Sequence, residues 1–255
     1  MEKFNYKKYK EQIKRLKDSW LCKIPIAHRG LHNEDAPENS LKAFQNAVDK
    51  NYAIELDIHL LKDGNIAVFH DNSLKRVCGE NVMISSLTTE ELKKYKINGT
   101  DQTIPTLDEV MELVDGKVPL LVELKSFRLN GKLEEALYNK LKNYKGEYAI
   151  EAFNPFSISW FKNNAPEFPR GQLLADCKFL RVDDFISNLI LNSKATMPHF
   201  VATSTSGVDK IQNGDKPLLT WTVKTKEQYD KVMKYCDNAI FEKFNPLKAF
   251  THSKV

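Results

Sequence analysis

The 255-residue sequence lacks several patterns that mark large classes of proteins. It has no run of eighteen or more apolar residues, and its first ten residues, MEKFNYKKYK, lack the apolar stretch of a signal peptide. We therefore expect a cytoplasmic protein without stable membrane insertion. The four cysteines are scattered without a C-x-x-C pair, which argues against a disulfide framework or a zinc site.

Outside one segment, the basic and acidic side chains are equal in number. The chain has 38 basic and 34 acidic side chains, and residues 1–18 contain the whole excess of positive charge. A broad basic face for nucleic acid is therefore not expected. Glycine-rich loops of the types G-x-G-x-x-G and G-x-x-x-x-G-K-[ST] are absent, which disfavours the main alternative fold, an open doubly wound sheet.

What the chain does contain is a repeated alternation of β-prone runs and amphipathic segments. Strands are predicted at 24–28, 53–58, 119–124, 148–153, 170–175, 199–203, 218–223 and 238–242. Helices are predicted near 37–50, 131–143, 156–163, 182–192, 207–212 and 226–235. Eight alternating units predict an α/β fold, a (β/α)8 TIM barrel that forms a single domain over residues 1–255.

Two segments lie outside this alternation. Residues 1–20 have apolar side chains at steps of three to five, which predicts an amphipathic helix. Packing against the domain is favoured over contact with an anionic membrane surface. Residues 72–118 form an insertion with at least two helix starts, because T-T-E-E at 88–91 and T-L-D-E at 106–109 match the capping box.

One predicted hairpin concentrates polar side chains. Glu55, Asp57 and His59 alternate with apolar residues and so share one face of a strand. The Asp-Gly pair at 63–64 predicts a tight turn, and a turn centred on that pair places His70 opposite Asp57. The alternative is an exposed sheet face with a solvated row of polar side chains.

Side chains at the carboxyl ends of the first three strands should converge, because barrel enzymes build their sites at that face. Three carboxylates, those of Glu55, Asp57 and Glu123, repel one another unless a cation lies among them. Oxygen ligands suit Mg²⁺ or Ca²⁺ better than zinc. Arg29 and Lys125 add the positive charge that a phosphate ester needs.

His28 and His70 complete the predicted site as a pair of imidazoles that titrate near neutral pH. One would take a proton from the attacking oxygen and the other would give a proton to the leaving oxygen. The sequence leaves open which histidine is the acid and which is the base.

Seven short motifs follow in order: HRG (28–30), PEN (37–39), ELD (55–57), KDG (62–64), FHD (69–71), IPTLDE (104–109) and VELK (122–125). Together they resemble the glycerophosphodiester phosphodiesterase family, closely over residues 24–126 and more loosely to the end of the chain. The resemblance implies a (β/α)8 barrel that hydrolyses glycerophosphodiesters to sn-glycerol 3-phosphate and an alcohol. It also implies that the glycerol hydroxyl next to the ester attacks phosphorus, giving a cyclic phosphate that water opens.

The resemblance assigns roles as well. The family's metal ligands fall on Glu55, Asp57 and Glu123, its catalytic histidines on His28 and His70, and its phosphate contacts on Arg29 and Lys125. Trp221 either lines the glycerol pocket or belongs to the core. The family's metal ion would be Mg²⁺ or Ca²⁺, and the partner a small-molecule glycerophosphodiester.

Four positions depart from the family or have an open role. Ser40 replaces the usual threonine after PEN, and Glu242 stands where the family often has a different last-strand motif, I-I-T-D. His59 is expected to be a solvated side chain rather than a rim contact. Glu151 is a candidate extra acid in the barrel mouth.

Two other functions remain open. A phospholipase D-like enzyme acting on lysophospholipids or related lipid phosphodiesters would need an exposed apolar rim, for which only the insertion offers residues: Val77, Val82, Met83, Ile84 and Leu87. A non-catalytic barrel that only binds a phosphodiester would normally have lost a histidine or an acid, and none is lost. The alcohol half of the substrate and the oligomeric state are left open.

Overall fold

The computed structural model describes residues 5–126, 129–174 and 193–246. The chain divides into two compact units, one of residues 26–152 and the other of residues 1–25 with 153–255. Each of the eight predicted strands is present in the described residues, and their ends differ from the predicted ones by at most two residues. The expectation of a single domain over 1–255 stays a prediction.

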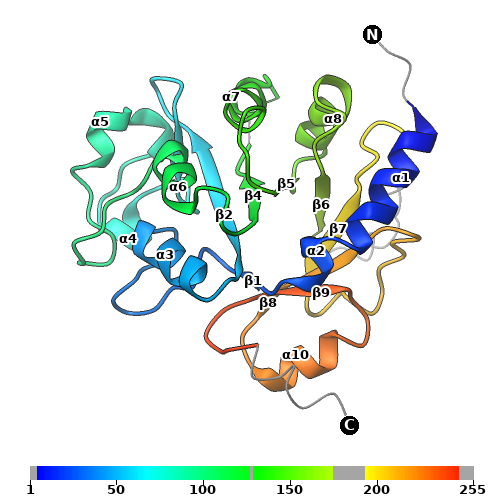
Figure 1. Ribbon diagram of the computed structural model, residues 1–255. Coiled ribbons are helices and arrows are strands. Elements are labelled where there is room, and N and C mark those ends of the chain that lie inside the picture. The colour runs from blue at the N-terminus through cyan, green and yellow to red at the C-terminus, as the bar shows by residue number, and fades with distance from the viewer. Residues whose placement is uncertain (1–4, 127–128, 175–192, 247–255) are drawn as a thin grey trace. The chain divides into compact units, whose positions relative to one another are not determined.

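The unit of residues 26–152 is built on a parallel sheet. Its parallel strands, in the order in which they pair, are β1 (Ile26–Ala27), β2 (Ala53–Leu60), β4 (Leu120–Leu124) and β5 (Tyr148–Ala152). Its longer helices are α3 (Leu41–Asp49), α6 (Leu107–Val114) and α7 (Lys132–Leu141). Figure 1 shows α3 and α6 packed side by side next to β2.

Strand β3 (Ile66–Val68) returns antiparallel to β2, so it is not one of the parallel barrel strands. The predicted hairpin register is wrong by one residue, because Phe69 and not His70 lies opposite Asp57, whose carbonyl oxygen accepts from the Phe69 amide at 2.9 Å. The turn has three residues, 62–64, instead of two. Gly64, the last residue of the turn, has a left-handed φ of 85°, which lets the turn accommodate a third residue.

The insertion folds around its own small core. It contains α4 (Lys75–Cys78), the 3₁₀ turn η1 (Ile84–Ser86) and α5 (Thr89–Leu92), and both predicted capping boxes are formed. Val77, Ile84 and Leu87 are buried in this core, while Met83 is 51% exposed. The predicted residues of an apolar rim are therefore mostly internal.

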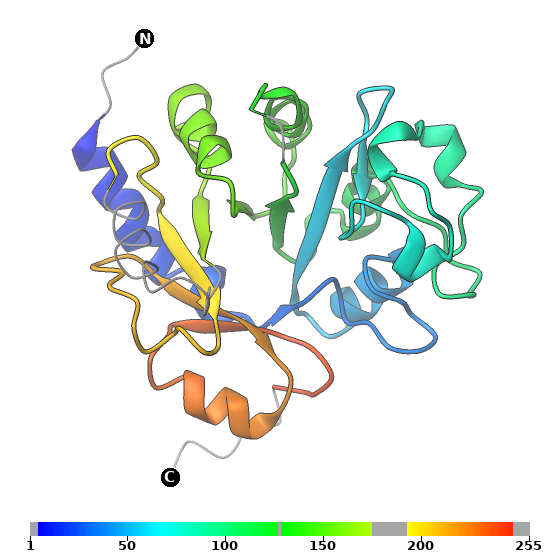
Figure 2. The same cartoon turned by 180° about the vertical axis from the view of Figure 1, so that it is seen from behind.

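The second unit also has parallel strands and covering helices. Its strands are β6 (Arg170–Leu174), β7 (Phe200–Ser204), β8 (Leu218–Val223) and β9 (Asn238–Phe241). Its helices are α1 (Tyr6–Lys17), α2 (Trp20–Lys23), α8 (Pro155–Asn164) and α10 (Lys226–Val232). Figure 2 shows α1 in blue beside β7 in yellow.

Helix α1 packs on its unit, as predicted. Its apolar face buries Tyr9, Ile13 and Leu16, and the Tyr9 hydroxyl donates to the carbonyl oxygen of Pro198 at 2.8 Å. By contrast, the helix predicted at 207–212 is wrong, since residues 205–210 form turns. That segment begins Thr-Ser-Gly, and its small polar residues and glycine favour turns over a helix. The helix predicted at 182–192 lies outside the described residues.

Eight parallel strands that alternate with helices make this a (β/α)8 barrel, the predicted fold class. Within the described part of the chain, none of the helices has both the length and the apolar composition needed to cross a membrane.

Candidate active site

Three predicted carboxylates meet on neighbouring strands. Glu55 and Asp57 lie on one face of β2, and Glu123 lies opposite Asp57 in the register of β4. All three side chains are buried, and they bring carboxylate oxygens within 4.8 Å of one another. The alternative of a solvated polar row is therefore wrong, because this face of the sheet is turned inward.

Two cationic side chains contact these acids. Lys125 Nζ lies 2.9 Å from Asp57 Oδ1 and 2.6 Å from Glu123 Oε1. Arg29 Nε lies 3.3 Å from Asp57 Oδ2, and the Arg29 backbone amide donates to Glu55 Oε2 at 2.8 Å. The structure thus brings together Arg29 and Lys125 with all three predicted metal ligands.

The three carboxyl groups differ in how burial and neighbouring charges change their pKa. Burial, together with the neighbouring charge of Asp57, raises the pKa of Glu55 well above its ordinary value. The same two causes raise the pKa of Glu123 to about 7. Burial also acts to raise the pKa of Asp57, but Lys125 and Arg29 outweigh it and lower that pKa below its ordinary value. Negative charge in this pocket is therefore costly without a further cation.

The HRG motif forms a tight turn after β1. Arg29 and Gly30 have φ angles of 54° and 79°, in the left-handed region. A Cβ atom on Gly30 would lie 2.9 Å from the carbonyl carbon of Ala43 and 2.9 Å from a ring carbon of Phe44. Only glycine lets the turn pack this closely on α3, which holds the Arg29 amide against Glu55.

The PEN motif supports the site from the start of α3. The Asn39 amide donates to Asp57 Oδ2 at 2.9 Å. The Glu38 carboxylate accepts from Arg29 Nη1 at 2.8 Å. Ser40 caps the helix by accepting from the Ala43 amide at 3.1 Å, so serine fills the capping role here as threonine does in other helices. The motif in the sequence does not by itself predict these contacts of Glu38 and Asn39.

His70 follows β3 and is held by a carboxylate. Its Nδ1 lies 2.5 Å from Asp71 Oδ1, and Arg76 on α4 bonds both oxygens of Asp71. Arg76 also bonds both oxygens of Glu38, at 2.7 and 2.9 Å. Asp71 and Arg76 were not predicted as site residues, although the carboxylate next to His70 in the FHD motif was an available signal.

His59 is buried, which corrects the expectation of a solvated side chain. Its Nε2 donates to the backbone carbonyl oxygen of His70 at 3.1 Å. Burial lowers the pKa of His59 to about 4, so this imidazole is neutral at neutral pH. His59 therefore anchors the segment that carries His70.

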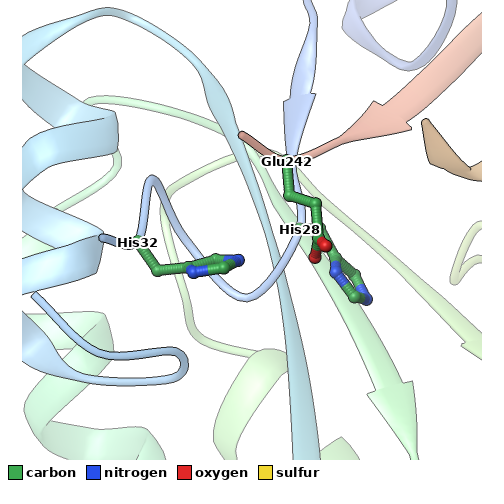
Figure 3. A group of neighbouring side chains, drawn as sticks. All are labelled: His28, His32 and Glu242. Atoms are coloured by element: carbon green, nitrogen blue, oxygen red, sulfur yellow. The ribbon is translucent and has the colours of Figure 1, made fainter. Parts of the chain in front are cut away.

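His28 and His32 follow β1 in the same loop, as Figure 3 shows. Both are half-buried, and they offer ring nitrogens within 4.8 Å of each other. Figure 3 also draws Glu242, which follows β9 in the other unit. His28 thus lies where the first strand ends, as predicted.

Two further residues of interest belong to the second unit. Trp221 on β8 is half-buried, and its ring meets that of Phe153 edge-on at 5.6 Å. Glu242 lies 2.9 Å from Lys224 Nζ. The role of Trp221 as a substrate contact stays a prediction.

The site fits a divalent cation. Its three acids offer only oxygen donors, they are buried, and burial with mutual repulsion raises the pKa of two of them. Mg²⁺ and Ca²⁺ prefer such ligands. Glu55, Asp57 and Glu123 would hold the ion.

A (β/α)8 barrel with buried acids, two cations and two histidines near its strand ends is the arrangement of a phosphate-ester hydrolase. Residues 28–242 match the glycerophosphoryl diester phosphodiesterase family, and the chain belongs to this family. It is therefore an enzyme of the phosphoric diester hydrolase class.

Curated relatives support this assignment, and a solved structure shares the fold. A glycerophosphodiester phosphodiesterase of Caldanaerobacter subterraneus subsp. tengcongensis is 32% identical over 222 residues, which cover 83% of this chain and 90% of that protein. A lysophospholipase D of Rattus norvegicus is 37% identical over 136 residues, covering 48% of this chain and 42% of that protein. The structure of an Oleispira antarctica phosphodiesterase in complex with the product sn-glycerol-3-phosphate has a TM-score of 0.75 at 24% identity, and the match covers 89% of this chain and 96% of that one.

Proposed function

We propose that this enzyme hydrolyses glycerophosphodiesters to sn-glycerol 3-phosphate and an alcohol, with Mg²⁺ or Ca²⁺ held by Glu55, Asp57 and Glu123. The observation that carries the proposal is the group of three buried carboxylates within 4.8 Å, contacted by Arg29 and Lys125. The activity named for the Caldanaerobacter relative, which aligns over most of both chains, supports the substrate class.

The cationic side chains prepare the site for a phosphate group. Arg29 and Lys125 are held in place by the carboxylates they contact, so their positive charge is fixed before substrate arrives. When bound, the divalent cation would supply Lewis-acid stabilisation of the phosphate's negative charge.

The two histidines divide the proton transfers. The glycerol hydroxyl next to the ester attacks phosphorus and loses its proton to one imidazole, while the bond from phosphorus to the alcohol oxygen breaks. The other imidazole gives its proton to that oxygen, and the product is a cyclic phosphate. Water then opens the ring with the proton transfers reversed.

The contact with Asp71 prepares His70 for this work. Because Asp71 accepts from Nδ1, the Nε2 atom of His70 is left to exchange the proton. No hydrogen bond links Nε2 to another group among the described residues. His28 is our candidate for the second imidazole.

The alternative substrate class, lysophospholipids, has the name of the rat relative in its favour. The insertion argues against it, since Val77, Ile84 and Leu87 are buried and do not form an apolar rim. A cavity of about 570 Å³ beside Lys125 has a mixed lining, with polar residues and with the apolar side chains of Leu60, Leu61, Met83 and Leu133. The competing substrates in the test below therefore decide between the two classes.

The test is the release of glycerol 3-phosphate from glycerophosphocholine, with lysophosphatidylcholine as the competing substrate. We expect EDTA to abolish turnover, Mg²⁺ or Ca²⁺ to restore it, and His70→Ala to lower it by roughly 100-fold or more. Turnover that survives EDTA would overturn the assignment of the three carboxylates. Full activity of His70→Ala would remove His70 from the mechanism, and preference for the lipid would establish the alternative.

A further inference from the structure

A fourth carboxylate extends the row of acids across the sheet. In the parallel register, Asp57 of β2 lies beside Glu123 of β4, and Glu123 lies beside Glu151 of β5. Neighbouring strands are about 4.8 Å apart, and residues in register point to the same face. Glu151 is therefore the next acid in the row that holds two of the predicted metal ligands.

Glu151 lacks the support that the other acids have. It is 1% exposed, and its Oε2 atom has no hydrogen-bond partner. Asp57 accepts from Asn39, and Glu123 accepts from Lys125. A buried carboxylate without such bonds costs several kcal/mol, roughly, in a protein interior. An apolar residue would serve a purely structural purpose at this position better.

The charges near Glu151 are those of the candidate site. Burial raises its pKa well above the ordinary value, and repulsion from Glu123 and Asp57 acts in the same direction against the attraction of Lys125. The acids of the group are Glu55, Asp57, Glu123 and Glu151, and the cations in contact with its members are Lys125 and Arg29, which also bonds Glu38. The acids outnumber the cations, so a divalent cation among them would reduce the excess of negative charge.

We propose that Glu151 is a positioning residue of the metal site, which strengthens the binding of the divalent cation from just beyond its direct ligands. Glu151 is outside the group of oxygens that lie within 4.8 Å of one another, so it acts through Glu123 or through a water molecule of the ion's hydration shell. The inference rests on the proposed function, because it needs the cation site. It adds to that proposal a further residue, Glu151, whose substitution changes the affinity for the divalent cation.

Calorimetric titration of the full-length protein with Mg²⁺ and with Ca²⁺ tests this inference. Glu151→Gln keeps the shape of the side chain and removes its charge. We expect the Kd of the cation to rise roughly 10- to 100-fold in this variant. The melting temperature in EDTA should stay equal or rise, because one of four mutually repelling acids has gone.

The control is Glu134→Gln, which changes a buried glutamate on α7 of the same unit, outside the row of acids. This variant should bind the cation with the affinity of the unmodified protein. Cation affinity that is unchanged in Glu151→Gln, or a lower melting temperature in EDTA with unchanged affinity, would show that Glu151 is structural and overturn the inference. If the unmodified protein binds neither cation, the metal site of the proposed function fails too, so the two failures are distinguishable.

Discussion

Removing the guanidinium of Arg76 should impair catalysis far more than stability. Arg76 bonds both oxygens of Glu38 and both oxygens of Asp71. Glu38 in turn holds Arg29 at 2.8 Å, and Asp71 holds His70 at 2.5 Å. One side chain on the insertion thus bonds the two carboxylates that hold Arg29 and His70, our proposed phosphate contact and proton carrier.

The expected loss of stability follows from the exposure of Arg76, and the expected loss of kcat follows from the roles proposed for Arg29 and His70. The Arg76 side chain is 49% exposed, and ion pairs of exposed groups contribute about 0–1 kcal/mol each. The change in melting temperature in Arg76→Gln should therefore be only a few degrees. Loss of a group that orients active-site residues costs roughly 10- to 100-fold in activity, and we expect kcat to fall by that factor.

The assay is glycerol 3-phosphate release with kcat and KM determined separately, beside thermal unfolding. Lys75→Gln, an exposed change on the same helix, should keep full activity. Arg76→Lys should recover only part of kcat, because an ammonium cannot bond two carboxylates in the forked geometry of a guanidinium. Free guanidinium in the assay should partly restore Arg76→Gln, since about half of the Arg76 side chain is exposed to solvent. A normal kcat in Arg76→Gln would refute the reasoning.

Three further predictions concern the second unit. His199 is buried, and its ring nitrogens bond the Arg170 amide and the Gln12 side chain. Burial lowers the pKa of His199 well below the ordinary 6.5. As the pH falls, the unfolded chain therefore binds a proton that the folded chain does not. When the pH falls from about 7.5 to about 5.5, this histidine should lower the free energy of unfolding by about 1.4 kcal/mol. Chemical denaturation at the two pH values should show this loss in the unmodified protein and not in His199→Gln. Ile13→Ala removes a buried side chain of α1 and should cost about 2–5 kcal/mol, which lowers the melting temperature by several degrees or more. Deletion of residues 1–20 should lower it further, and unchanged stability would show that α1 does not support its unit.

The hairpin shows what alternation in a sequence can and cannot predict. Its period of two correctly placed Glu55 and Asp57 on one face, because side-chain direction along a strand follows directly from spacing. The predicted register was wrong by one residue, because an Asp-Gly pair can belong to a two-residue or a three-residue turn. Here Gly64 is the last residue of a three-residue turn. His70 nevertheless lies near enough to Asp57 to lower the pKa of that carboxyl group, and the bond from His59 to the His70 carbonyl oxygen anchors the segment that carries it.

Burial and supporting contacts were harder to predict. The spacing of His59 showed which face it shares with Asp57, but not that a barrel encloses that face, so a solvated side chain was expected. The contact of Arg76 with Glu38 joins residues 38 positions apart in the chain, and it depends on how the insertion folds. No local pattern in the sequence carries that information.

The insertion thereby links its own stability to the chemistry. Val77 anchors α4 in the insertion's core, and Phe69, the residue before His70, is buried in the same core. Arg76 precedes Val77 on that helix and reaches back to Asp71, the residue after His70. The apolar packing that holds α4 therefore also sets where His70 points. The insertion, which interrupts the barrel's alternation, is in this way coupled to His70, the histidine that we propose as catalytic.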